Sequence, residues 1–174
     1  MNNPVVKNIV RFVLLVLLQV LVFDTVQFGG YVVPYVFILF VLLLPLGINK
    51  SLLLVLAFLT GLTVDFFENT MGLQTAALVF MAFARPGVIR FYFPGLEFEK
   101  GEEPGLLKLG VTGFFKYTLT LALFYQFILT FLQVFSFRHV LRSLSQILIN
   151  GVVTTAVILV VMMLFSRREH RRRV

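Results

Sequence analysis

Two carboxylates near the end of an apolar run have the spacing of a catalytic acid and base. Asp65 and Glu68 are three residues apart, so a helix brings them to one face. The same side chains could instead cap the next helix by accepting hydrogen bonds from its unpaired N-terminal N–H groups. No metal-ligand pattern accompanies them, and we therefore predict the capping role.

Enzyme chemistry has little support elsewhere in the sequence. The two histidines, His139 and His170, lie outside the apolar runs, so neither a Ser–His dyad nor a zinc triad can form within them. No Gly-rich segment ends in the Gly-Lys-Ser/Thr pattern of a phosphate loop, and cysteine is absent. We predict a protein that is not an enzyme and that has no catalytic residue, cofactor or metal.

The remaining polar chemistry is that of amides and hydroxyls within apolar runs. Lipid offers these groups no hydrogen bond, so they must face protein or water. They could pack inside the protein or contact a transmembrane helix of a partner. The candidates share a face in two sets, Gln126 with Gln133 and, at a spacing of four, Gln146 with Asn150 and Thr154.

The composition is that of a membrane protein. Of the 174 residues, 59% are hydrophobic and 13% are charged, and the mean hydropathy is +0.98. Soluble domains average roughly 45–50% and 25%. The net charge of +7 could indicate nucleic acid, but the basic residues adjoin apolar runs, where they set topology and contact lipid head groups. We predict membrane lipids, and no nucleic acid, as partners.

The apolar runs predict an all-α integral membrane protein, a single domain formed by a compact bundle of about six transmembrane helices. Gly, Asn and Pro residues separate the runs, and Arg85, Pro86 and Gly87 are expected to close the fourth helix. Whether the third and fourth helices both span fully is left open. The predicted spans are 10–28, 31–48, 51–67, 70–84, 109–137 and 144–165, with a loop at 85–108 and a basic tail at 166–174.

The basic residues also predict an orientation. With both termini in the cytoplasm, every Lys and Arg except Arg138 and Arg142 lies on the cytoplasmic side. The loop 85–108 would then be cytoplasmic, as a solvated linker or as a docking surface for a partner. The basic tail would be cytoplasmic too, anchored on anionic lipid.

Small residues predict a tight helical hairpin. Ala57, Gly61 and Asp65 recur at a spacing of four and form one face of the third helix. Gly72 and Ala76 begin the fourth helix in the same way. Because small side chains let backbones approach closely, we expect the two helices to pack together around Gly61.

These residues carry a resemblance to a known family. The step from Gly61 to Asp65, followed after a short turn by Gly72-Leu73, resembles the core pattern of the rod shape-determining MreD family. The Arg85-Pro86 pair resembles one branch of that family. The resemblance implies a non-enzymatic scaffold of the bacterial cell-elongation machinery in the cytoplasmic membrane, supporting rod shape and lateral peptidoglycan synthesis. It implies binding to MreC, and through MreC to the MreB filament, RodA and a penicillin-binding transpeptidase.

The resemblance also supplies the alternative function. The MreD family is similar in fold to the substrate-binding components of energy-coupling-factor transporters, which hold a vitamin or metal in an outward-facing cavity. Such a component should place polar and aromatic side chains around a pocket, yet this sequence has no Trp and few polar residues at its predicted outer face. The small-residue face around Gly61 and the polar stripe around Asn150 favour the scaffold, because they provide a groove and amides for docking a partner helix, which we expect the Gly61 groove to capture.

Overall fold

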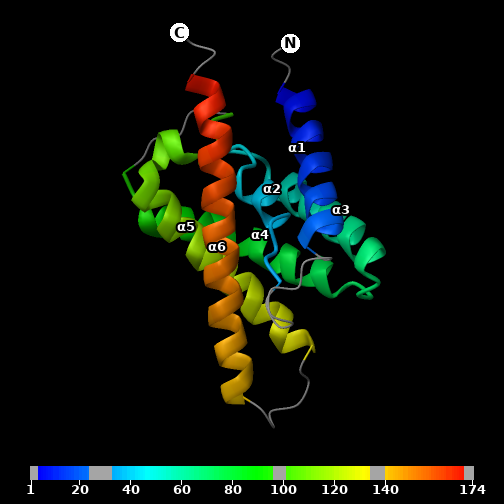
Figure 1. Cartoon of the computed structure of the whole chain (residues 1–174). Helices are drawn as coiled ribbons and strands as arrows, with labels where there is room; N and C mark the ends of the chain where they lie inside the picture. Colours follow the sequence, from blue (N-terminus) through cyan, green and yellow to red (C-terminus); the bar gives the residue numbers. More distant parts are fainter. Residues whose placement is uncertain (1–3, 24–32, 96–100, 134–139, 171–174) are drawn as a thin grey trace.

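The chain is helical throughout the part that the structure describes. The structure is a computed structural model, and it describes residues 4–23, 33–95, 101–133 and 140–170. No strand occurs within these ranges (Figure 1). The elements are α1 (Pro4–Leu18), the π-helical turn η1 (Gln19–Phe23), α2 (Ile38–Leu42), α3 (Lys50–Glu68), α4 (Leu73–Tyr92), α5 (Leu106–Gln133) and α6 (Val140–His170).

Four helical stretches are long and apolar enough to cross a membrane. Each has at least 18 residues, close to the roughly 20 that a hydrocarbon core of about 30 Å requires. The predicted all-helical, multi-pass character is therefore confirmed, whereas a bundle of six spans stays a prediction. The four stretches are Val5–Phe23, Lys50–Glu68, Leu106–Gln133 and Leu144–Leu164.

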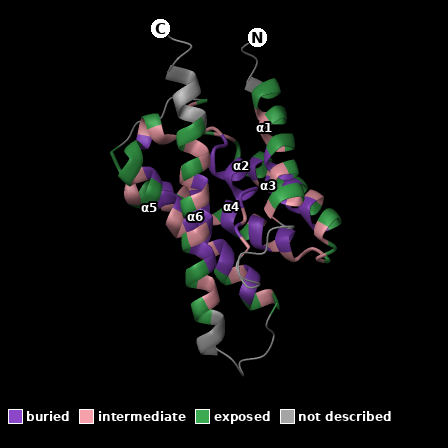
Figure 2. Cartoon of the chain, in the orientation of Figure 1, coloured by how far each residue is buried: buried purple, intermediate pink, exposed green. Residues whose placement is uncertain are grey.

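The outer faces of these helices carry the apolar side chains that lipid requires. Ile9, Val13 and Leu17 are exposed at a spacing of four along α1, and Leu148 and Val152 are exposed on α6. Figure 2 shows the buried residues gathered on α2 and on the helix faces around it. A surface of this kind would be unstable in water and suits a hydrocarbon solvent.

The second apolar run is not one helix, which corrects the predicted span 31–48. Within the described residues 33–49 only Ile38–Leu42 is α-helical, although every side chain from Val36 to Leu44 is at most 5% exposed. Pro45 has no N–H to continue a helix and disfavours a helical Leu44, and Gly47 has a positive φ of 86°. The segment is apolar on all sides because protein, not lipid, surrounds it.

The fourth helix is longer than predicted. It continues to Tyr92 with Pro86 inside it, so Arg85, Pro86 and Gly87 do not close it, and the predicted loop 85–108 begins only after Tyr92. Proline removes one N–H donor, and the burial of Arg85 and Ile89 against the bundle offsets that loss.

The other predicted boundaries differ at the helix ends. Helix α1 begins at Pro4 rather than residue 10, and α6 covers Val140–His170 rather than 144–165, so part of the predicted tail is helical. Helix α5 begins at Leu106 and is interrupted at Gly110, whose φ of 68° and ψ of 170° are not helical. The predicted positions 24–28, 134–137 and 171–174 lie outside the described residues.

Consecutive helices pack side by side. Helix α3 packs mainly against α4, α4 against α5, and α5 against α6, while α1 contacts α2 and α3. The start of α1 and the end of α6 lie toward the same end of the molecule (Figure 1). The short helix α2 lies among the longer helices at the centre of the bundle.

Because the native chain has no cysteine, single cysteines can test which residues face lipid. We expect Val152→Cys, on the exposed apolar face of α6, to resist a water-soluble maleimide in intact membranes and to react after detergent solubilisation. Asn49→Cys, at the exposed turn before α3, should react in both conditions with a maleimide that reaches its side of the membrane. Equal labelling of Val152→Cys before and after solubilisation would show that α6 is not embedded.

Candidate functional site

The carboxylate of Asp65 ties the end of α3 to the start of α4. Its Oδ1 accepts a hydrogen bond from the Gln74 N–H at 3.0 Å, and its Oδ2 accepts one from the Thr75 N–H at 2.8 Å. The hydroxyls of Thr70 and Thr75 also donate to it. Asp65 is 5% exposed, so these four donors replace the water that a buried carboxylate loses. The predicted capping role of Asp65 is confirmed.

The backbone between the two helices turns by using left-handed conformations. Asn69, Met71 and Gly72 have φ values of 55°, 52° and 89°. A left-handed residue after a helix satisfies its last carbonyls, and here the Asn69 and Thr70 N–H groups both reach the Asp65 carbonyl. Glycine takes such a conformation at least cost, which accounts for Gly72 at the N-terminal boundary of α4.

Gly61 lies where the backbones of α3 and α4 come closest. A Cβ atom on Gly61 would lie 2.4 Å from the Thr75 Cα and 3.0 Å from its backbone nitrogen. Ala57, one turn earlier, is fully buried. The predicted tight hairpin is present, but its small-residue face is covered by α4 of the same chain. Gly61 therefore cannot be the surface that captures a partner helix, which corrects that expectation.

Gln74 extends this contact to a third helix. Its Nε2 donates to Glu68 Oε2 at 2.6 Å, and its Oε1 accepts from the Tyr125 hydroxyl on α5. Glu68 thus contacts the start of α4 through the Gln74 side chain. Tyr35 and Phe37 pack edge-on against the Tyr125 ring, with centroids 5.5 and 6.0 Å away.

The irregular segment around α2 exposes backbone groups that side chains from other helices satisfy. Gln19 Oε1 on η1 accepts from the Val36 N–H at 2.9 Å, and Thr154 Oγ1 on α6 accepts from the Tyr35 N–H at 3.2 Å. A backbone group without a partner in a membrane interior costs several kcal/mol. Gln19 and Thr154, two polar residues within the apolar runs, thus provide hydrogen-bond acceptors for the backbone of this segment.

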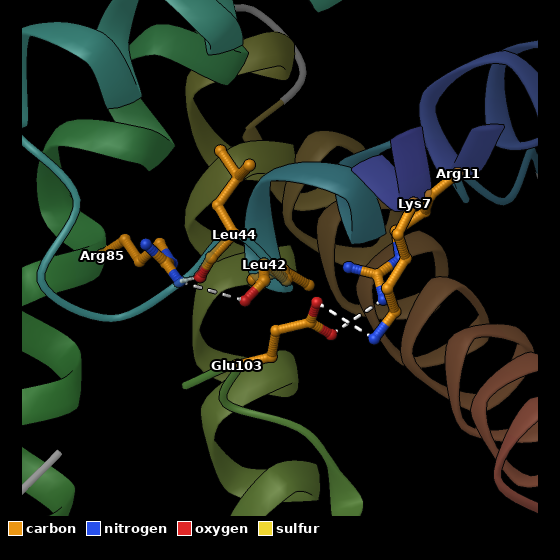
Figure 3. A network of polar contacts seen from close by, with 6 residues as sticks. All are labelled: Lys7, Arg11, Leu42, Leu44, Arg85 and Glu103. Carbon is orange, nitrogen blue, oxygen red and sulfur yellow. Dashed lines mark hydrogen bonds and ion pairs between the residues drawn. The ribbon is translucent and has the colours of Figure 1, made fainter. Parts of the chain in front are cut away.

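Arg85 donates hydrogen bonds to backbone carbonyls at the C-terminal end of the irregular segment around α2. It is 2% exposed, and its Nη2 donates to the carbonyls of Leu42, at 3.4 Å, and of Leu44. Its Nε donates to the Tyr117 hydroxyl at 2.9 Å, which in turn donates to the Leu42 carbonyl at 3.0 Å. Figure 3 shows Arg85 pointing at these carbonyls.

A second polar cluster joins α1 to the segment before α5. Glu103 accepts from Arg11 Nη2 at 2.8 Å and lies 3.3 Å from Lys7 Nζ, as Figure 3 also shows. Glu102 pairs with Lys108 at 2.8 Å. Glu102 and Glu103 of the predicted loop thus engage the chain itself, which gives no support to a docking surface at these two residues, while Glu97 and Glu99 lie outside the described residues.

The predicted partner-contact residues divide by burial. Gln126, Asn150 and Thr154 are 4%, 8% and 2% exposed, so the bundle itself covers them, which favours internal packing. Gln146 is half-buried, and Gln133, at the end of α5, is exposed. Of the other motif residues, Leu73 and Ala76 are half-buried at the start of α4, as is Pro86 near its end.

Several of these contacts could not be identified from sequence patterns alone. The sequence analysis assigned no role to Gln19, a lone amide in an apolar run, or to Tyr117 and Tyr125, whose hydroxyls need hydrogen-bond partners once buried. Gln74 lay within the motif but had no assigned role. Each residue depends on a partner from another segment of the chain, which no local pattern shows.

Comparisons with known proteins return no likeness for this chain. No protein-family model, no curated protein and no solved structure matches it.

Asp65→Asn should destabilise the hairpin because an amide offers one acceptor oxygen to four donors and adds an N–H₂ group. We expect a loss of about 2 kcal/mol or more in unfolding free energy, measured by circular dichroism in detergent. Glu68→Gln is the matched control and should cost under about 1 kcal/mol, because its oxygen can still accept from Gln74. Equal losses in the two variants would contradict the role given to Asp65.

Gly61→Ala should destabilise the protein by about 1–3 kcal/mol because its Cβ meets the α4 backbone, which cannot move without separating the helices. Gly87→Ala on α4 is the control, because nothing lies within 4 Å of a Cβ there. Removing a helical glycine at that site should be neutral or stabilising by up to about 1 kcal/mol. The same unfolding measurement checks both, and a neutral Gly61→Ala would contradict the close approach.

Proposed function

We propose that this chain is a non-enzymatic membrane scaffold of the bacterial cell-elongation machinery, similar to the MreD family. In this role it binds an MreC-like single-span protein and supports rod shape and lateral peptidoglycan synthesis. Through that partner it acts with the MreB filament, RodA and a penicillin-binding transpeptidase. Its place is the bacterial cytoplasmic membrane, with both termini in the cytoplasm.

The observation that carries the proposal is the convergence of the motif residues. Gly61, Asp65 and Gly72 carry the sequence resemblance, and they meet in one structural unit: a close helix approach, a shared carboxylate and a left-handed turn. Each needs the residue type found there. A motif whose residues all build one hairpin supports a structural role for that hairpin rather than a catalytic one.

Partner contacts are expected on the faces that the chain leaves exposed. The side of α3 away from α4 presents Leu52, Val55, Leu59, Leu62 and Phe66, each about half exposed or more. The hairpin fixes the position of this face. An apolar transmembrane helix of the partner would pack there through van der Waals contact.

The placement of the helix ends and of two basic residues supports the proposed orientation. The start of α1 and the end of α6 lie toward the same end of the molecule (Figure 1), and Lys7 and Arg11 lie at the α1 end. Basic residues concentrate on the cytoplasmic side of bacterial membrane proteins. Two termini on that side accord with the scaffold's need to reach a cytoplasmic filament through its partner.

The alternative, a vitamin-type substrate-binding component of a transporter, has less support. Asp65, Glu68, Gln74 and Tyr125 are described polar groups at the end where such a ligand would enter. They bind one another and the α4 backbone. A ligand site there would first have to break these hydrogen bonds.

Purification from native membranes at native expression tests the proposal. We expect mass spectrometry to identify an enriched MreC-like single-span protein with the unaltered chain. Gly61→Leu should recover much less of it because separating α3 from α4 displaces the exposed face of α3, whereas Gly87→Leu should behave as the unaltered chain. Recovery of an energy-coupling ATPase pair or a bound vitamin instead would overturn the scaffold in favour of the transporter.

A further inference from the structure

A cavity opens between the connection that precedes α3 and the second half of α4. It has a volume of about 570 Å³, within the range of small-ligand sites. Leu46, Leu53, Ile89 and Phe93 form its apolar walls. The cavity lies at the ends of α3 and α4 away from the Asp65 turn, and none of its lining residues belongs to the exposed α3 face proposed for the partner.

Three cations line this cavity, and no acidic residue does so among the described residues. Lys50 begins α3 and Arg90 lies in the last turn of α4, and both side chains are exposed. Arg85 is the third and is buried, so it forms the deepest positive charge. A cavity that combines positive charge with apolar walls has the chemistry of a site for an anionic amphiphile.

Among the described residues, the buried Arg85 has no counter-ion. Its Nε and Nη2 bind a phenol and two carbonyls, all neutral, and within the described part of the chain Nη1 has no hydrogen-bond partner. None of the ion pairs within the described residues includes Arg85: Glu102 pairs with Lys108, and Glu103 with Lys7 and Arg11. A buried unpaired charge is costly, and an anion in the cavity would relieve that cost.

The cavity also lies at the level where lipid head groups are found. It adjoins the first residues of α3, a membrane-crossing stretch, and so lies at one end of the span. The Leu46 N–H donates to the Glu102 carbonyl at 2.7 Å, and the neighbouring Glu103 binds Lys7 and Arg11. The same end thus carries the basic residues of α1, as expected beside an anionic leaflet.

We propose that this cavity binds the head group of an anionic phospholipid. Arg85, Lys50 and Arg90 hold the phosphate, and one acyl chain follows the apolar wall formed by Leu53, Ile89 and Phe93. The bound lipid stabilises the region where Arg85 meets the irregular segment around α2. This inference depends on the membrane placement of the chain and not on the scaffold function.

Lipid titration with thermal unfolding in nanodiscs tests the proposal. The protein is placed in phosphatidylcholine discs with increasing phosphatidylglycerol, and native mass spectrometry counts the retained lipids. We expect saturable binding of phosphatidylglycerol with a rise in unfolding temperature, and no such rise with phosphatidylcholine alone. Inorganic phosphate is added in a separate arm. An equal rise with phosphate alone would overturn the lipid assignment in favour of a free anion.

The variants avoid Arg85, which the fold itself needs. Lys50→Gln combined with Arg90→Gln removes the two exposed cations of the cavity and should weaken phosphatidylglycerol binding about tenfold or more. Lys116→Gln removes an exposed cation of α5 that does not line the cavity, and should change binding less than about twofold. Binding that is lost equally in both, or in neither, would overturn the proposal.

Discussion

Every backbone polar group in an apolar medium needs a partner from the protein, and this constraint governs the arrangement of polar residues in the bundle. The long helices satisfy their own backbones. The start of α4 and the irregular segment around α2 do not, and both lie within the packed bundle. Asp65 accepts hydrogen bonds from the backbone N–H groups at the start of α4. In the segment around α2, Arg85 and Tyr117 donate to backbone carbonyls, and Gln19 and Thr154 accept from backbone N–H groups. Polar residues within the apolar runs are therefore mainly structural.

The same constraint explains why the bundle is cross-linked between helices that are distant in sequence. Gln74 joins α3, α4 and α5, and Thr154 joins α6 to Tyr35. Such hydrogen bonds between helices replace part of the hydrophobic driving force, which is absent between helices in lipid. A chain organised in this way has a fixed internal framework with an apolar exterior. That combination suits a scaffold, which holds binding surfaces for its partners in fixed positions and needs no reactive group.

The framework also separates two parts of the molecule with different chemistry. At the α3–α4 turn, the carboxylate of Asp65 has four donors and is fully satisfied. At the other end of that hairpin, the guanidinium of Arg85 has only neutral partners, beside an open cavity with two further cations. Thr75, which binds Asp65, and Arg85 lie ten residues apart on α4, about three helical turns, so the carboxylate and the guanidinium do not neutralise each other.

The sequence by itself determined the local features of this protein. Hydropathy over windows of about 20 residues predicts the membrane-crossing helices because a span depends on its own composition. The spacing of Ala57, Gly61 and Asp65, with Gly72 beyond the turn, predicts the hairpin because its two helices are adjacent in sequence. The tertiary structure alone decided that the second apolar run forms only a short helix, and that Arg85 is buried inside α4. Both depend on contacts between residues about 40 to 120 positions apart, whose free energies no local pattern contains.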